Sequence, residues 1–365
     1  MIIGTPLKFH DQQDILRYRE RMLSFVMGVV SAVLLSVAVD VLTGGVTKGL
    51  RRLRLRWASS TALQVDTSAD GLFMLGEWSP VRQLHPHRLS TIELSKPERP
   101  VQSFVDEEVF AGAVARCHQD TGEIAYITSF RLDHRESLET QICRVTLAAS
   151  DYAEVRAIEL LRQTAPLTLS HADQALQHNA SEYVKRAVPS SVAINVIPIS
   201  QDQELLCARR SAAVDNGVGM WTVGVFETMK RADPNRPGQP EDFYALGQRA
   251  LLEEVGLKSH DYGDLNVSWV GIYKPLLRGH IVASVRLRIS KEEALEHARM
   301  SDSSYEHDTY DWIPLNRATV RSFAAAKMRP SSSGGGTLNI DEREWLEQAR
   351  LAVLEAWRFR VVLQD

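Results

Sequence analysis

An uncharged apolar run near the start of the sequence constrains this chain more than any other feature. From Met22 to Val39 the sequence reads MLSFVMGVVSAVLLSVAV, which is 18 residues without a charge. As a helix this run would span about 27 Å, close to the hydrocarbon thickness of a bilayer. A buried core helix and a signal peptide are the alternatives, but the run lacks a polar stripe and follows a mostly polar segment. The sequence therefore predicts one transmembrane helix over 22–43.

Basic residues lie on both sides of this run and predict its orientation. They are denser on the C-terminal side, where no acid separates them: Lys48, Arg51, Arg52, Arg54 and Arg56. The excess of basic residues near a membrane span favours the cytosolic side. We therefore expect a polar N-terminal segment over 1–21, a basic juxtamembrane segment over 44–60 and a cytoplasmic C-terminal part.

Small residues recur at every fourth position of the predicted span. They begin at Ser24 and continue with Gly28, Ala32 and Ser36, and the same spacing reaches Asp40. On a helix they share one stripe, and small side chains in such a stripe let two helices approach closely. Gly28, Ala32, Ser36 and Asp40 are therefore candidates for self-association, although small residues are also common in membrane helices. The carboxylate of Asp40 is costly in lipid, so we expect it to face a partner helix, water or headgroups.

Composition bounds the remaining sequence. A length of 365 residues favours about two domains, and a mean hydropathy of −0.19 excludes a multi-pass transporter. The formal charge of −4 argues against a polycationic coat for nucleic acid, and we expect no binding of duplex nucleic acid. The three cysteines form no CxxC pair, which is typical of free thiols and not of a disulfide framework or a zinc site.

The part after the predicted span divides by its patterning. We expect a β-rich region with helices over 61–188, a second domain over 189–329, a linker over 330–338 and an amphipathic helix over 339–365. Within the first region, residues 108–132 read as a strand hairpin with its turn at 120–122, and Ser150 and Asp151 are candidate caps of a helix. Whether 61–188 folds separately or wraps around the second domain stays open.

The segment EDFYALGQRALLEEVGL, residues 241–257, carries the clearest chemistry. As a helix it presents positions 250, 253, 254 and 257 on one face, so Glu253 and Glu254 project together before Gly256 ends the helix. Carboxylate oxygens at this density suit Mg²⁺, which commonly bridges to substrate phosphates. A solvated acidic helix end is the alternative.

This segment resembles the Nudix box, G-x5-E-x7-R-E-U-x-E-E-x-G-U, where U is a bulky aliphatic residue. The positions that match in register are Glu241, Arg249, Leu251, Glu253, Glu254, Gly256 and Leu257. The segment from Trp221 through Gly224 to Glu227 is similar to the strand that usually precedes the box. Two positions depart, because Asn235 stands where the first glycine belongs and Ala250 replaces the first glutamate of the R-E pair. The resemblance extends over about residues 190–328.

The resemblance implies an α+β fold, a Nudix-like α/β/α sandwich with a mixed sheet. It also implies that Glu241, Glu253 and Glu254 belong to a site for a divalent metal such as Mg²⁺ that clamps a diphosphate. The missing glutamate helps to ligate the metal or acts as general base, and the methyl group of Ala250 can do neither. We therefore assign no catalytic residue and expect a pocket for nucleoside phosphates that binds more than it hydrolyses.

A membrane helix joined through a β-rich region to a Nudix-like domain resembles the TM-Nudix effectors of bacterial anti-phage signalling by cyclic oligonucleotides (CBASS). The resemblance implies an inner-membrane protein of antiviral defence that binds a cyclic (oligo)nucleotide and clusters its helices as a homo-oligomer to damage the lipid bilayer. Arginine suits a phosphate ligand and an aromatic ring can stack on a base. The candidate ligand-binding residues are Arg209, Arg210, Trp221, Glu227, Arg286 and Arg288. Each of these arginines has the alternative of a surface or salt-bridged side chain.

Two other functions compete with this reading. The chain can be a membrane-anchored Nudix hydrolase of a nucleoside diphosphate derivative, with Glu241 or a later acid in place of the missing base. It can also be a single-pass scaffold whose Nudix-like domain binds only protein. Mg²⁺-dependent turnover distinguishes the first, and the absence of any nucleotide-induced thermal shift distinguishes the second.

Overall fold

The structure, a computed structural model, describes residues 72–77, 92–94, 104–118, 122–134, 141–214, 217–230, 241–301, 303–330 and 336–362. Residues Ala62–Asp365 form one compact unit. The predicted segments 1–21, 22–43 and 44–60, with Gly28, Ala32, Ser36 and Asp40, lie outside the described residues. Of the helices that the structure describes, none combines the length and the apolar character needed to cross a bilayer.

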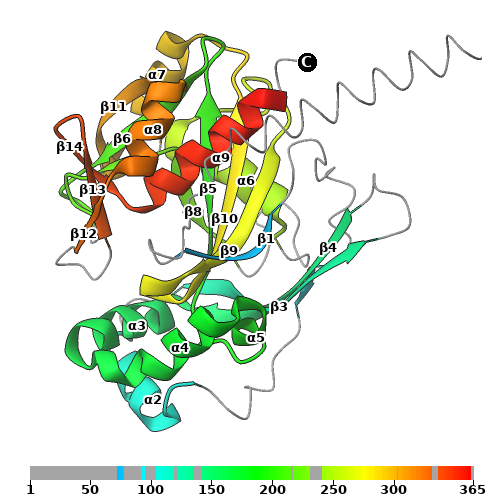
Figure 1. Cartoon of the computed structure of the whole chain (residues 1–365), viewed down its shortest axis with the longest axis vertical. Helices are drawn as coiled ribbons and strands as arrows, with labels where there is room; N and C mark the ends of the chain where they lie inside the picture. Colours follow the sequence, from blue (N-terminus) through cyan, green and yellow to red (C-terminus); the bar gives the residue numbers. More distant parts are fainter. Residues whose placement is uncertain are drawn as a thin grey trace, which may run out of the picture. The chain divides into compact units, whose positions relative to one another are not determined.

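The described elements follow one another along the chain as labelled in Figure 1. The first half contains β1 (Leu72–Glu77), β2 (Ile92–Leu94), α2 (Glu107–Arg116), β3 (Glu123–His134), β4 (Gln141–Asp151), α3 (Tyr152–Thr164), η3 (Pro166–Leu169), α4 (Ser170–His178) and α5 (Ala180–Val184). The second half contains β5 (Val192–Ile199), β6 (Glu204–Arg210), β7 (Trp221–Val223), β8 (Val225–Thr228), α6 (Phe243–Val255), β9 (Asn266–Tyr273), η4 (Lys274–Leu276), β10 (Arg278–Arg286), α7 (Lys291–Arg299), η5 (Ser304–Glu306), β11 (His307–Pro314), α8 (Arg317–Ala325), β12 (Met328–Pro330), β13 (Gly336–Ile340), β14 (Arg343–Leu346) and α9 (Gln348–Val362).

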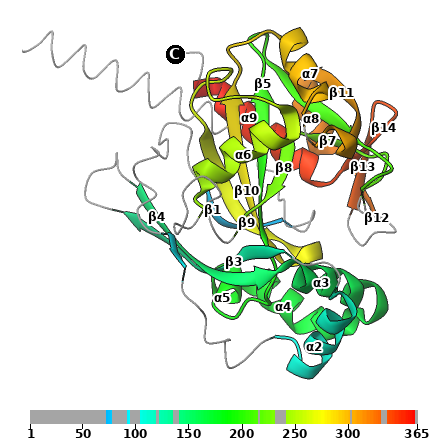
Figure 2. The same ribbon diagram turned by 180° about the vertical axis from the view of Figure 1, so that it is seen from behind.

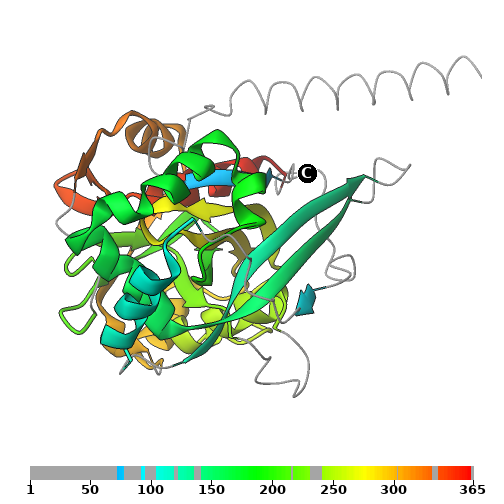
Figure 3. The same cartoon turned by 90° about the horizontal axis from the view of Figure 1, so that it is seen from below.

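Most strands belong to one mixed sheet. Its main path runs β1-β9-β10-β5-β6-β7-β14-β13-β12, with β11 paired to β6 and β8 paired to β5. The pairs β10/β5 and β14/β7 are parallel, and the other pairs are antiparallel. A second sheet has the order β2-β4-β3, and the two strands of its β3–β4 ribbon run side by side in Figure 3. The expected α+β fold with a mixed sheet is confirmed.

Helices cover both faces of the large sheet. Every residue of β5 is buried, and its side chains alternate between two hydrophobic clusters, as expected of a strand covered on both faces. Ile194 and Val196 belong to the cluster that contains α6, whereas Ile197 and Ile199 belong to the cluster that contains α9. Helix α9 lies in front of the sheet in Figure 1, and α6 lies in front of it in Figure 2. This is the α/β/α layering that the resemblance implied.

Helix α6 begins and ends where its local sequence directs. The side chain of Asp242 accepts hydrogen bonds from the backbone N–H groups of Tyr244 and Ala245, at 2.9 and 2.7 Å, and so caps the N-terminus. Gly256 ends the helix in the left-handed conformation, with φ of 67°. A Cβ atom at this position would lie 2.8 Å from the carbonyl oxygen of His297, so a side chain is excluded by contact as well as by φ.

The region before β5 shares its core with the large sheet. Ile127 of β3 and Ile158 of α3 lie in the same hydrophobic cluster as Val192 and Ile281. The contact is close, because a Cβ atom on Gly279 would lie 2.9 Å from Cδ1 of Ile127. Residues on both sides of position 188 therefore stabilise one another through common apolar burial.

The predicted hairpin over 108–132 is wrong in its first strand. Residues Glu107–Arg116 form helix α2 instead, and β3 pairs with β4. The side chain of Asp106 accepts hydrogen bonds from the backbone N–H groups of Glu108 and Val109, at 3.0 and 3.1 Å. This cap, together with acidic residues in the first turn, favours a helix over a strand.

The predicted linker and C-terminal helix also differ from the structure. The span 330–338 includes residues of strands β12 and β13, and the helix expected over 339–365 begins only at Gln348. Between them β13 and β14 form a hairpin, in which Asp341 and Glu342 have φ of 50° and 65°. Two consecutive positive φ values are typical of the tight turn that joins antiparallel strands, so this turn interrupts the apparent helical pattern.

His280 is a completely buried residue of β10. Neither of its ring nitrogens has a hydrogen-bond partner among the described residues. Its ring lies 5.9 Å from the rings of both Phe226 and Trp269. Burial, and then the charge of Arg278, lower the pKa of His280 to about 3, so the imidazole is neutral in the folded protein.

We expect His280→Leu to make the protein less sensitive to acid. In the unfolded chain His280 binds a proton below about pH 6.5, whereas the folded protein resists this protonation, so stability falls as the pH drops from 6.5 towards 3. The variant should be more stable than the wild type by about 2 kcal/mol at pH 5, and by less at pH 8. Thermal unfolding at both pH values measures this, with His260→Leu, whose side chain is 76% exposed, as control. Equal differences at the two pH values would contradict the assignment.

Candidate functional site

A cleft of about 450 Å³ lies between helix α3 and the large sheet. Its lining residues include Tyr152 and Glu159 of α3, Arg210 of β6 and Arg278 of β10. Glu254, near the C-terminal end of α6, also lines it. The cleft therefore brings the predicted box helix together with a helix from the region before β5.

Arg249 of α6 gathers the acidic side chains next to this cleft. Its Nε donates to Glu241 at 2.7 Å, and its Nη1 lies 3.0 Å from Glu227 and 3.1 Å from Glu253. Its Nη2 donates to the carbonyl oxygen of Thr228 at 2.7 Å. The side chains of Arg249 and Glu241 are only 4% and 1% exposed. Buried charges of this kind are stable only when they are paired and hydrogen-bonded, and here both conditions are met.

The adjacent glutamates of the box differ in environment. Glu253 is 36% exposed and lies 3.6 Å from the ammonium of Lys230 in addition to its contact with Arg249. Glu254 is buried, and burial, followed by repulsion from Glu306 and Glu227, raises its pKa to about 8. At neutral pH the carboxyl group of Glu254 is therefore mostly protonated.

The contact between Glu254 and His307 is a neutral one. His307 Nδ1 lies 3.9 Å from Glu254 Oε2, a distance within the usual limit for ion pairs. Burial, however, lowers the pKa of His307 to about 4, and that of Glu254 is raised, so both groups are uncharged at pH 7. We therefore treat it as packing between neutral groups, which agrees with the lack of a hydrogen-bond partner for this nitrogen.

The donor set does not fit a Mg²⁺ site. Glu241, which was expected to ligate a metal with Glu253 and Glu254, instead binds Arg249 and accepts a hydrogen bond from the backbone N–H of Lys230 at 2.8 Å. Ala250 is completely buried and offers only a methyl group. Across the ranges that the structure describes, no group of three or more His, Cys, Asp or Glu side chains is placed to hold an ion.

Two arginines also line the cleft. Burial lowers the pKa of both Arg210 and Arg278, yet an arginine stays charged at neutral pH. The guanidinium of Arg278 lies 5.5 Å from the centre of the Tyr273 ring, which also lines the cleft. The cleft thus holds guanidinium groups beside carboxyl groups, and the guanidinium groups suit a ligand with an anionic part.

The structure brings some of the predicted ligand residues into the cleft and leaves others outside. Arg210 and Glu227 line it. Arg209 points away and forms two hydrogen bonds with Asp308, at 2.8 and 2.9 Å.

The remaining predicted residues also lie away from the cleft. Trp221 packs 6.0 Å from Trp345, and the guanidinium of Arg343 lies 4.4 Å above its ring. Arg286 ends β10, at the opposite end of the strand from Arg278, and Arg288 lies two residues beyond it. Neither of them lines the cleft.

Sequence reasoning missed Arg278, Tyr152 and Glu159. A cation shortly before the apolar residues of β10 was the available signal for Arg278. Nothing in the local pattern of α3 connects it with the box, because the cleft depends on contacts between distant segments. Tyr273, an aromatic residue at the end of β9, lines the cleft as well.

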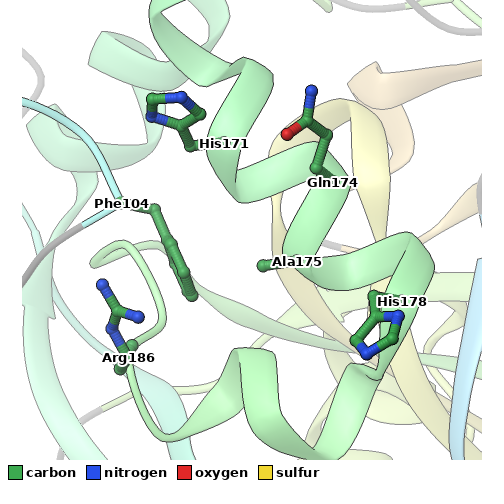
Figure 4. A pocket seen from close by; sticks show the side chains of 6 residues that line it. All are labelled: Phe104, His171, Gln174, Ala175, His178 and Arg186. Carbon is green, nitrogen blue, oxygen red and sulfur yellow. The ribbon is translucent and has the colours of Figure 1, made fainter.

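A second hollow, of about 540 Å³, lies in the helical region and is shown in Figure 4. It is lined by Phe104, His171, Gln174, Ala175, His178 and Arg186. His171 and His178 lie apart in this view, and the guanidinium of Arg186 lies 4.3 Å from the centre of the Phe104 ring. No box residue lines this hollow, so it is separate from the cleft.

Comparisons with known proteins give limited information. No family model matches the sequence, and no curated protein matches it significantly. Similar solved structures include a Nudix hydrolase from Alicyclobacillus acidocaldarius, with 12% identity over 48% of this chain and 96% of that one and a TM-score of 0.32. DR0079 from Deinococcus radiodurans has 11% identity over 46% and 83% of the two chains and a TM-score of 0.31. The MutT protein from Methanosarcina mazei has 17% identity over 36% and 79% and a TM-score of 0.24. Similarity at this level does not assign the chain to a family.

We expect Arg249→Met to be strongly destabilising. The substitution leaves the carboxylate of Glu241 buried without its partner, and breaking such a pair typically costs about 3–5 kcal/mol. Urea unfolding of the variant measures the loss, with the exposed Arg317→Met as control. A loss below about 1 kcal/mol would show that the network does not hold the fold together.

A second expected outcome concerns Glu254→Gln and pH. The pKa of Glu254 is raised from 4.5 to about 8 on folding, so the wild type loses stability as the pH rises between these values. Glutamine keeps the shape of the protonated acid and does not ionise. The variant should match the wild type near pH 4 and exceed its stability by on the order of 2 kcal/mol at pH 8. Thermal unfolding across this pH range measures the stability difference, with Glu296→Gln, whose side chain is exposed, as control. A stability difference that does not change with pH would refute ionisation of Glu254 as its cause.

Proposed function

We propose that this chain is a membrane-tethered sensor that binds a nucleotide in its cleft without hydrolysing it. The observation that carries the proposal is the Arg249 network, because it engages Glu227, Glu241 and Glu253 while Ala250 replaces the expected general base. Hydrolysis needs a group that accepts a proton from the attacking water. Glu254 is mostly protonated at neutral pH and does not supply such a group.

The cleft supports the binding part of the proposal. It has the volume typical of a small-molecule site, and it combines aromatic side chains with guanidinium groups. Nucleotides carry both a base that stacks on aromatic rings and phosphates that bind arginine. A cyclic (oligo)nucleotide fits this description and is the ligand class that the resemblance to TM-Nudix effectors implies.

The membrane part of the proposal rests on the sequence of 22–43. In this proposal the span anchors the chain in a bacterial inner membrane with its C-terminal domain in the cytoplasm, and ligand binding favours a homo-oligomer. The helices then cluster through Gly28, Ala32, Ser36 and Asp40 and disrupt the bilayer as an antiviral response. A ligand shifts such an equilibrium only when the clustered form binds it more tightly.

Leakage from vesicles tests the sensor function. The full chain is reconstituted into dye-filled vesicles of phosphatidylethanolamine and phosphatidylglycerol, and cyclic dinucleotides are added. We expect dye release with the wild type and its loss in Gly28→Leu and Ala32→Leu, because larger side chains keep the helices apart. Val30→Leu, which lies off the stripe, should leak like the wild type. Unchanged leakage in both stripe variants would remove the clustering mechanism.

A membrane-anchored Nudix hydrolase is the second candidate function. One observation favours it, since Glu227 and Glu254 both line the cleft, and Mg²⁺ is often bound by two carboxylates together with substrate phosphates. In this function Mg²⁺ displaces the proton of Glu254 and competes with Arg249 for Glu227. The hydrolase reading requires Mg²⁺-dependent cleavage of a nucleoside diphosphate derivative that disappears in Glu254→Gln. Binding without product in prolonged incubation would favour the sensor.

A further inference from the structure

We infer that Arg210 and Arg278 form an anion subsite in this cleft, which binds a phosphate group of the ligand. The inference rests on the proposed function, because it identifies where in the same cleft the anionic part of a nucleotide is held. Arg278 was not among the residues that the sequence indicated, and its assignment comes from burial and from unsatisfied hydrogen bonding.

Arg278 is a partly buried cation, and one of its hydrogen-bond donors has no acceptor. Its buried Nε has no hydrogen-bond partner among the described residues. Its guanidinium faces the ring of Tyr273 and lies in the field of Glu159. A buried donor without an acceptor is destabilising, and the common explanation in a cleft is a ligand that supplies the acceptor.

Arg210 adds a second positive charge to the same cleft. It ends β6, lines the cleft, and is close enough to Arg278 for their charges to repel. Two guanidinium groups that repel each other in a cleft are stabilised together when an anion lies between them. A phosphate group, whose oxygens accept several hydrogen bonds from planar guanidinium forks, suits such a pair.

The turn before Arg278 is fixed by helix α3. Arg162 binds both carboxylate oxygens of Asp173, at 2.5 and 2.6 Å, and donates to the carbonyl oxygens of Lys274 and Pro275, at 2.7 and 3.1 Å. These bonds tie α3 and α4 to η4, which immediately precedes β10. Arg162 is therefore a positioning residue that holds the first residue of β10 in place opposite α3.

Carboxyl groups line the same cleft. Glu227, Glu254 and Glu306 are among its lining residues, and the charges of Glu306 and Glu254 act on Arg210. Oxygen atoms of carboxyl groups and of a phosphate compete for the same donors and repel when both are ionised. The phosphate therefore binds chiefly through Arg278, whose Nε has no hydrogen-bond partner among the described residues.

Tyr152 and Tyr305 supply surfaces for the base of a nucleotide. Both rings line the cleft, and they are exposed by 39% and 63%. Exposed aromatic rings at the edge of an arginine-containing cleft are typical stacking surfaces for bases. The ligand class that fits the whole cleft is therefore a nucleotide with a phosphate group near its centre or end.

Binding measurements on the full chain test the subsite. Cyclic di-AMP, ADP and inorganic pyrophosphate are titrated in buffer with EDTA, so that no metal bridges the phosphate. We expect the Kd of each probe that binds to rise at least tenfold in Arg278→Gln and Arg210→Gln, as for loss of a charge-assisted hydrogen bond. The Kd of Arg278→Lys should lie between those of the wild type and of Arg278→Gln. The Kd of Arg321→Gln, whose side chain is exposed, should equal that of the wild type.

Thermal unfolding without ligand separates binding from a structural role. Removal of an unsatisfied buried charge should leave the Tm of Arg278→Gln unchanged or raise it by a few degrees. A lower Tm together with an unchanged Kd in Arg278→Lys and Arg278→Gln would show a structural arginine and overturn the subsite.

The outcomes also separate this inference from the proposed function. If the wild type binds a probe and both arginine variants bind it equally well, the subsite is wrong while the sensor function stands. If pyrophosphate alone binds with the same affinity as the nucleotides, the site holds a free phosphate and the stacking part is wrong. If the wild type binds none of the probes, the proposed function itself is contradicted.

Discussion

The guanidinium of Arg249 is the interaction on which the arrangement of the cleft depends. It joins three segments: β8 through Glu227, the start of the box through Glu241, and α6 through Glu253. Because Glu241 is almost completely buried, its charge cannot be left without this partner. The matching box positions therefore serve a structural purpose that is independent of catalysis. The position of Ala250 is different, because an apolar residue there packs into the core and the fold does not need the lost glutamate.

The cleft combines two parts of the chain that the sequence separates. Its carboxyl groups belong to β8, α6 and η5 and, through Glu159, to the wall that α3 forms. Arg162 connects that wall to the turn before Arg278. A shared hydrophobic cluster beneath the cleft keeps α3 and the sheet together, so the two walls are parts of one folded unit.

Local signals were sufficient for some elements and insufficient for others. Helix α6 was predicted with its end at Gly256, because caps and apolar spacing lie within the segment itself. Glu227 was found through the strand that precedes the box, and Arg210 through the expectation that arginine binds a phosphate ligand. The hairpin β13–β14 was mistaken for part of a helix. Its turn has positive φ at Asp341 and Glu342, and the turn contains no glycine that would have indicated it. Arg278 was missed for a different reason. Its role depends on the approach of α3, which lies more than a hundred residues earlier in the chain.

Helix α9 has a consequence for how the chain is made. It is the last described element, and its buried residues, Ala349, Val353 and Ala356 among them, cover one face of the large sheet. Until this helix has been synthesised and has left the ribosome, it cannot cover the apolar side chains of that face. The sheet therefore completes its folding only after α9 is available, and a chain that stops before α9 exposes apolar strand residues that favour aggregation.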